Sequence, residues 1–168
     1  MKKAIPVLFA LFALTFAAFA DDDFGFGLWY DSPEQIKNKK IDGLALGLPV
    51  VSSKQVEGAS LSLFGNETGI MEGFQGTLLG YNKAKALHGV QLSFVNFQQK
   101  QHDDPAVQIG IYNQADGHGV QIGLVNYGKN NATFQFGLIN VNKHGLFPVF
   151  PFVNFNRRFF DRDDDWLD

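Results

Sequence analysis

The chain has 168 residues, a length that suits one domain of ordinary size. It contains no Cys, which excludes disulfides, Cys-ligated metal centres and thiol catalysis. Only 18% of its residues are charged and its formal net charge is −3, so it offers no basic footprint for nucleic acid, whereas 18 Gly and 18 Phe are high counts for a soluble enzyme.

The first 20 residues have the layout of an export signal. Two lysines precede an apolar run over residues 4–19, and small residues stand at Ala18 and Ala20 in the pattern of a cleavage site. The run is too short for a comfortable membrane-spanning helix. We therefore expect residues 1–20 to be a signal peptide, which leaves an exported mature chain of 148 residues with a formal charge of −5.

A short repeat occupies most of the mature chain. Residues 24–30 (FGFGLWY) predict a first strand, and residues 41–154 then carry units of the pattern Q-x-[GS]-x-x-N. Weaker units surround positions 45, 60 and 75, a last unit with Pro covers 149–154, and successive units are 13 to 17 residues apart. The residues that define the repeat are Gln91, Asn96, Gln108, Gly110, Asn113, Gln121, Gly123, Asn126, Gln135, Gly137, Asn140 and Asn154.

Each unit alternates with a period of two, which predicts strands. In the unit around Gln121, one parity carries Val120, Ile122 and Leu124, and the other carries Gln121 and Gly123. Polar segments rich in turn-forming residues separate the units. The mature chain is therefore expected to be all-β.

The main prediction for the fold is an antiparallel up-and-down sheet or barrel of about 8–10 strands. In that arrangement each unit is one strand of about ten residues, and four to six residues remain for each hairpin turn. An outward apolar band around a mixed polar interior suits an outer-membrane barrel, with membrane lipid as the partner of that band.

The alternative fold is a parallel β-solenoid of about eight coils. All units are alike, so Gln would stack on Gln and Asn on Asn in side-chain ladders. Against it, only half of each unit is apolar, so the returning segment of a coil has little apolar surface to bury. This objection favours the barrel.

No catalytic, cofactor-binding or metal-binding set emerges from the motifs. Only one of the four histidines, His102, lies in a local acidic cluster. We expect all four to be solvated turn residues and not metal ligands. The column of repeat glutamines would line the lumen of a barrel, where it could bind a ligand or, more simply, satisfy its neighbours' hydrogen bonds. We expect one β-repeat domain over 21–160, followed by an acidic tail over 161–168 that is more simply a solvated end than a cation site.

The repeats and the closing segment LFPVFPFVN (residues 146–154) resemble a family of exported bacterial surface-repeat proteins first named from Leptospira. That resemblance covers roughly residues 24–160, and the acidic tail departs from it. It implies a surface location and says little about activity. The hexapeptide Q-x-G-x-x-N is also similar to the core of curlin repeats, the subunits of secreted amyloid, although the second curlin strand motif is largely absent here.

Together these observations predict a non-enzymatic protein at the outer membrane or cell surface of a Gram-negative-type bacterium. Its role would be structural or one of interaction with a surface or host partner that the sequence does not identify. The alternative is a secreted β-solenoid or a curlin-like assembly subunit.

Overall fold

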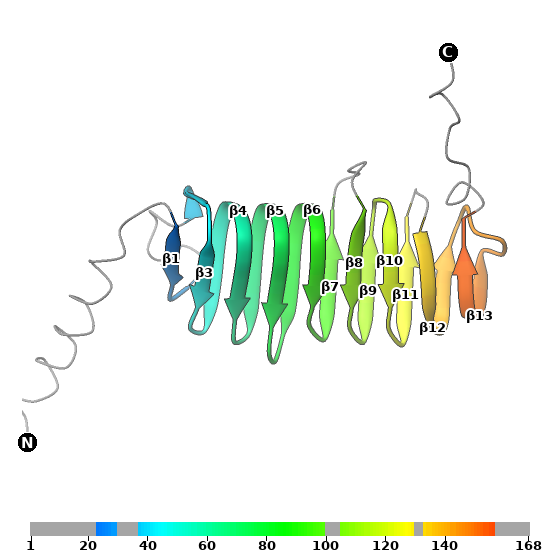
Figure 1. The fold of residues 1–168 in the computed structure, drawn as a ribbon. Helices are drawn as coiled ribbons and strands as arrows, with labels where there is room; N and C mark the ends of the chain where they lie inside the picture. Colours follow the sequence, from blue (N-terminus) through cyan, green and yellow to red (C-terminus); the bar gives the residue numbers. More distant parts are fainter. Residues whose placement is uncertain (1–22, 30–36, 100–104, 130–132, 157–168) are drawn as a thin grey trace, which may run out of the picture.

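A computed structural model describes residues 23–29, 37–99, 105–129 and 133–156. Over these residues the chain is all-β and winds into a parallel β-solenoid of about six turns (Figure 1). Its strands are β1 (Phe24–Gly27), β2 (Lys40–Ile41), β3 (Leu44–Gly47), β4 (Val50–Ser62), β5 (Gly65–Thr77), β6 (Tyr81–Leu92), β7 (Val95–Gln98), β8 (Ala106–Ile109), β9 (Tyr112–Ala115), β10 (Gly119–Ile122), β11 (Val125–Gly128), β12 (Thr133–Asn142) and β13 (Val149–Phe155).

Two parallel sheets run the length of the solenoid, and each coil contributes one segment to each. We call them the Gln sheet and the Asn sheet after the repeat residue that each carries. The Gln sheet consists of β1, β3, residues 59–62 of β4, 74–77 of β5, 89–92 of β6, β8, β10 and 133–136 of β12. The Asn sheet consists of residues 50–53 of β4, 65–68 of β5, 81–84 of β6, β7, β9, β11 and 139–142 of β12.

The register of the Gln sheet confirms the repeat alignment up to position 135. Ala45 lies beside Ser60, which lies beside Gln75. The same register then continues through Gln91, Gln108, Gln121 and Gln135. The predicted first strand also takes part, because β1 pairs in parallel with β3.

The predicted antiparallel barrel is wrong, and the stated alternative, a parallel β-solenoid, is right, although it has about six turns where about eight coils were predicted. Each unit forms two short strands rather than one long strand, because the chain turns after the [GS] position: Ile122 ends β10 and Val125 begins β11 on the opposite sheet. Both strands then pair in parallel with their equivalents in the neighbouring coils. The [GS] position marks a corner of the coil.

In the later coils this corner is occupied by Gly110, Gly123 and Gly137, because those coils approach one another closely, whereas earlier coils carry Ser62, Thr77 and Ser93 there. A Cβ on Gly123 would meet the carbonyl oxygen of Gly110 and the side-chain amide of Asn113, and a Cβ on Gly137 would meet Gly123 and Asn126 in the same way. Such contacts with backbone leave no room for a side chain. The repeated Gly therefore sets the turn between the two sheets.

A small apolar core is confined to the N-terminal half of the solenoid. There the coils are 15 to 16 residues long and have a third side, on which Ile41, Val56, Met71 and Leu87 are fully buried. They lie in register, because Ile41 is beside Val56, Val56 beside Met71 and Met71 beside Leu87. In the last coils, which are 13 and 14 residues long, the largest fully buried side chains are Gln and Asn.

The C-terminal end is closed by β13, which runs antiparallel to β12 (Figure 1). Phe155 lies beside Phe134 and Asn154 beside Gln135, so the Pro-containing segment 149–154 is not an eighth parallel unit. Its prediction as a last repeat copy is wrong for a physical reason. Pro148 and Pro151 lack the N–H groups that a strand inside a parallel sheet would donate.

Several predictions fall on residues outside the described ranges. The signal peptide, with its cleavage residues Ala18 and Ala20, lies there, and so do His102 and the acidic tail.

Candidate functional site

The repeat glutamines form a continuous hydrogen-bonded ladder inside the solenoid. In each step the Nε2 group of one Gln donates to the Oε1 atom of the Gln one coil earlier, over 2.7 to 2.8 Å. In the four later glutamines the side-chain amide also donates to a backbone carbonyl six residues later, such as that of Gln114 for Gln108. Gln75 donates instead to Asn66 and Thr68. The members of this Gln ladder are Gln75, Gln91, Gln108, Gln121 and Gln135, all at most 1% exposed.

The repeat asparagines form a second ladder on the facing sheet. Here Nδ2 donates in the opposite direction, to the Oδ1 atom of the Asn one coil later, over 2.8 to 3.1 Å. The same amide also donates to a backbone carbonyl of the next coil, such as that of Ile122 for Asn113. The members of this Asn ladder are Asn82, Asn96, Asn113, Asn126 and Asn140, all fully buried.

These ladders decide between the two predicted roles of the glutamines. Each Gln is buried among other amides and bonded to them, so the column fills the interior and satisfies its own hydrogen bonds. The prediction that Gln side chains stack on Gln and Asn on Asn is confirmed. A ligand-lined lumen is absent over this stretch of the described chain.

The apolar parity of the repeat lies on the outside of the molecule. Outward side chains of the Gln sheet and of the turns that follow its strands form what we call the apolar face. None of its described positions carries a charge. It consists of a row at Phe24, Leu44, Ala59, Phe74, Val90, Val107, Val120 and Phe134, a row at Phe26, Leu46, Leu61, Gly76, Leu92, Ile109, Ile122 and Phe136, and turn tips at Leu48, Phe64, Leu78, Phe94, Ile111, Leu124 and Leu138.

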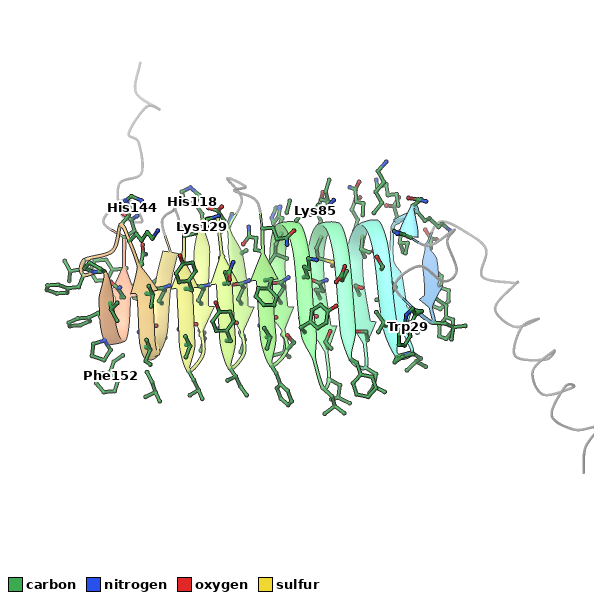
Figure 2. The ribbon with its side chains drawn as sticks, turned by 180° about the vertical axis from the view of Figure 1, so that it is seen from behind. Trp29, Lys85, His118, Lys129, His144 and Phe152 are labelled. Carbon is green, nitrogen blue, oxygen red and sulfur yellow. The ribbon has the colours of Figure 1, made fainter. Side chains whose placement is uncertain are left out.

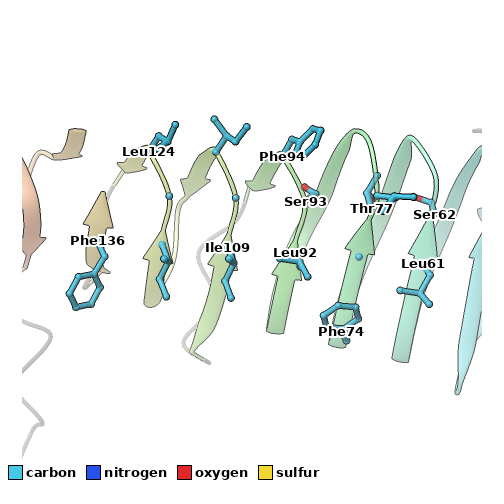
Figure 3. A pocket seen from close by; sticks show the side chains of 16 residues that line it. Leu61, Ser62, Phe74, Thr77, Leu92, Ser93, Phe94, Ile109, Leu124 and Phe136 are labelled. Carbon is cyan, nitrogen blue, oxygen red and sulfur yellow. The ribbon is translucent and has the colours of Figure 1, made fainter. Parts of the chain in front are cut away.

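An open groove of about 810 Å³ runs along this face, parallel to the solenoid axis (Figure 3). One wall is the sheet row that includes Leu92 and Ile109, and the other is the row of turn tips that includes Phe94 and Leu124. The floor is made of the small residues at the corner, Ser62, Thr77, Ser93, Gly110 and Gly123. Exposed fractions of 47% for Leu92 and 50% for Leu124 show how much apolar surface remains in contact with water.

The opposite edge of the solenoid is polar. Lys85, His118, Lys129 and His144 all lie on the edge away from the apolar turn tips (Figure 2). A second groove of about 420 Å³ lies near it, with walls that include several lysines and the carboxylate of Glu67. The molecule is thus amphipathic around its axis.

Ion pairs also lie away from the apolar face. The Lys40 ammonium is 2.8 Å from Glu57 and 3.3 Å from Asp42. Hydrogen bonds to Glu57 and then to Asp42 raise the pKa of Lys40 above its ordinary value. Such exposed pairs add little to stability and present no reacting group.

Within the described ranges, no group of three or more His, Asp or Glu side chains could hold a metal ion. No helix in that same part of the chain is long and apolar enough to cross a membrane. The candidate functional feature is the apolar face, and the barrel prediction assigns its apolar band to membrane lipid.

Comparisons with known proteins add no relative to this description. No family model, no curated protein and no solved structure matches the chain.

Proposed function

We propose that this chain is an exported, non-enzymatic β-solenoid that works by association through its apolar face. The observation that carries the proposal is the continuity of that face over the coils, with exposed Leu, Ile and Phe and no charge. Monomeric soluble proteins rarely expose contiguous apolar patches larger than a few hundred Å². A surface of this kind is typical of a docking site.

The interior supports a scaffold role. Two amide ladders on facing sheets bond successive coils to one another from Gln75 to Asn140, which favours a stiff rod whose outer residues are held in fixed rows. The export signal predicted at residues 1–20 and the resemblance to surface-repeat proteins support a location outside the cytoplasm, at the surface of a Gram-negative-type cell.

A curlin-like assembly subunit is a second candidate, which the in-register amide ladders favour. Growth at the C-terminal end would have to pass β13, an antiparallel strand that contains Pro151. Proline on an edge strand opposes further strand pairing. Association through the side of the solenoid is therefore the better-supported role.

The proposal is tested with the full chain in a Gram-negative-type host. The mature N-terminus should be Asp21, and the exported protein should run as a complex larger than a monomer on native sizing. Leu92→Glu/Ile122→Glu, which places two carboxylates on the apolar face, should release the monomer. Retention of the complex by this variant, or an uncleaved chain in the cytoplasm, would refute the proposed function.

A further inference from the structure

The outward side chains of the apolar face repeat at a regular spacing, and this spacing indicates the kind of partner that fits. Neighbouring strands in a sheet lie about 4.8 Å apart, so the outward rows repeat at that spacing along the solenoid. Leu92, Ile109 and Ile122 follow one another in register in the sheet row, with one apolar side chain per coil. A surface with the same spacing fits this face along its whole length, and the apolar face of a second copy has that spacing.

The groove supplies the matching shape. Its walls are two parallel rows of apolar side chains, and Gly110 and Gly123 keep its floor low (Figure 3). A row of branched side chains from a second copy can enter the groove while the groove of that copy receives the equivalent row. This reciprocal arrangement is the isologous contact of a two-fold dimer, and interdigitated apolar rows between flat sheets are the packing of a steric zipper.

The size of the face suits a stable dimer. From β1 to β12 the Gln sheet is roughly 34 Å long, and its outward rows and turn tips span about 16 Å, which gives a projected area of about 550 Å². Corrugation by side chains raises the accessible area towards the ~800 Å² per partner of a standard interface. The exposed fractions, 43% for Ile122 and 50% for Ile111, leave enough area to bury.

The charge distribution favours the same partner. The mature chain has a formal charge of −5, so two copies repel one another in most orientations. The apolar face has no charged position in the described part of the chain, and the ion pairs of Lys40 and Lys83 lie elsewhere. Contact between two copies through the apolar face therefore leaves the charged groups in water. An anionic lipid surface, in contrast, would repel an acidic protein.

We propose that the apolar face of this solenoid binds the apolar face of a second copy, which gives a two-fold, face-to-face dimer. This inference rests on the proposed function, since it names the partner of the same surface. The dimer is closed, because each copy uses the same apolar face in the contact and β13 caps the C-terminal end.

Sedimentation velocity of the purified mature chain tests the inference. At about 10 μM the wild type should sediment as a dimer, because interfaces of this size commonly reach micromolar affinity or better. Leu92→Glu/Ile122→Glu should weaken the dimer about 100-fold or more, since each carboxylate would be buried without a partner. These two positions are two coils apart, so their charges do not face each other directly in the sheet.

Tyr127→Glu is the matched control. Tyr127 points outward from the same coil as Ile122 but lies on the Asn sheet. This variant should remain a dimer, and circular dichroism should show that all three proteins keep the same β-sheet content. A second control, Leu92→Ser/Ile122→Ser, removes apolar area without charge and should weaken the dimer less than the Glu pair.

The outcomes separate this inference from the proposed function. A wild-type chain that stays monomeric when purified, while its native complex is still lost in Leu92→Glu/Ile122→Glu, refutes the dimer and leaves association with another partner. Co-sedimentation of a monomer with vesicles of phosphatidylethanolamine and phosphatidylglycerol refutes the dimer in favour of lipid. A dimer that Tyr127→Glu breaks and the Glu pair preserves refutes the apolar face as the interface, and thioflavin-positive fibres refute a closed dimer.

Discussion

The Nε2 group of Gln108 donates to the Oε1 atom of Gln91 over 2.8 Å, although the two residues are 17 positions apart. The same bond, from the same atoms, joins every pair of neighbouring glutamines in the ladder. Each interior Gln thus serves as donor to one coil and acceptor to the other. A side chain that is costly to bury alone becomes the element that holds successive coils together.

Breaking the ladder in its middle should cost more than breaking it at its end. Gln108→Leu leaves the Gln91 Oε1 without a donor and the Gln121 Nε2 without its ladder acceptor, and we expect about 3 to 5 kcal/mol less unfolding free energy. Gln135→Leu is the control, because its Oε1 is buried and has no hydrogen-bond partner, so only one ladder bond is lost. Urea denaturation should show roughly half the loss for Gln135→Leu, and equal losses would contradict the ladder.

The repeat and its strand character could be predicted because they depend on local patterning. The alternation of Val120, Gln121 and Ile122 identifies a strand in any β-architecture, and the fixed spacing aligns Gln with Gln. An apolar interior is the usual expectation for a solenoid, and that expectation favours the barrel. Here the coil instead buries Gln121 and Asn126, whose hydrogen bonds are completed only when the neighbouring coils are present.

Long-range pairing was the part that the sequence left open. Whether Gln121 lies beside Gln108 in parallel or faces it across a hairpin depends on where the chain turns, and one glycine at position 123 marks that turn. From the sequence alone, this corner glycine cannot be distinguished from a glycine within a barrel strand that faces a narrow lumen. The apolar rows were expected on the outside of a barrel, and they are outside here as well, on one face of the solenoid.

Gly123 should not tolerate a side chain, although earlier coils carry Ser or Thr at the equivalent corner. Gly123→Ala places a methyl group against the backbone of Gly110 and the amide of Asn113, and we expect a loss of about 2 kcal/mol or more in unfolding free energy. Gly76→Ala is the matched control, because its Cβ would meet only side-chain atoms of Phe74 and Leu61. Thermal unfolding followed by circular dichroism distinguishes the two, and a Gly76→Ala protein that is the less stable of the pair would contradict this account of the turn.

Stability should change little with pH across the neutral range. The buried polar side chains of the described residues are Ser, Thr, Asn and Gln, which do not titrate between pH 5 and pH 9. The raised pKa of Lys40 acts only at high pH: its contribution is complete below the unfolded value of 10.5 and is lost as pH rises through the higher folded value. Urea midpoints measured from pH 5 to pH 9 should agree closely, and a steep change near pH 6.5 would indicate a buried His.

One residue of the C-terminal cap has an unfavourable backbone conformation. Phe152 has φ of 67°, a left-handed value, and its side chain is exposed. Phe152→Asn should raise the unfolding free energy by up to about 1 kcal/mol, because Asn tolerates this conformation better than Phe does. Phe150→Asn, on the same strand and without a positive φ, should give no gain, and chemical denaturation of both variants tests the difference.

The central claim is that successive repeats pair in parallel around a polar interior, and disulfide mapping tests it most directly because the chain has no Cys of its own. Val107 lies beside Val120 and Ile109 beside Ile122 in the Gln sheet, so Val107→Cys/Val120→Cys and Ile109→Cys/Ile122→Cys should both form intramolecular disulfides under mild oxidation. An antiparallel hairpin that brings 109 beside 122 would instead bring 107 beside 124. The solenoid predicts that mass spectrometry will find both parallel pairs cross-linked. The result that would contradict it is a disulfide in Val107→Cys/Leu124→Cys together with none in Val107→Cys/Val120→Cys.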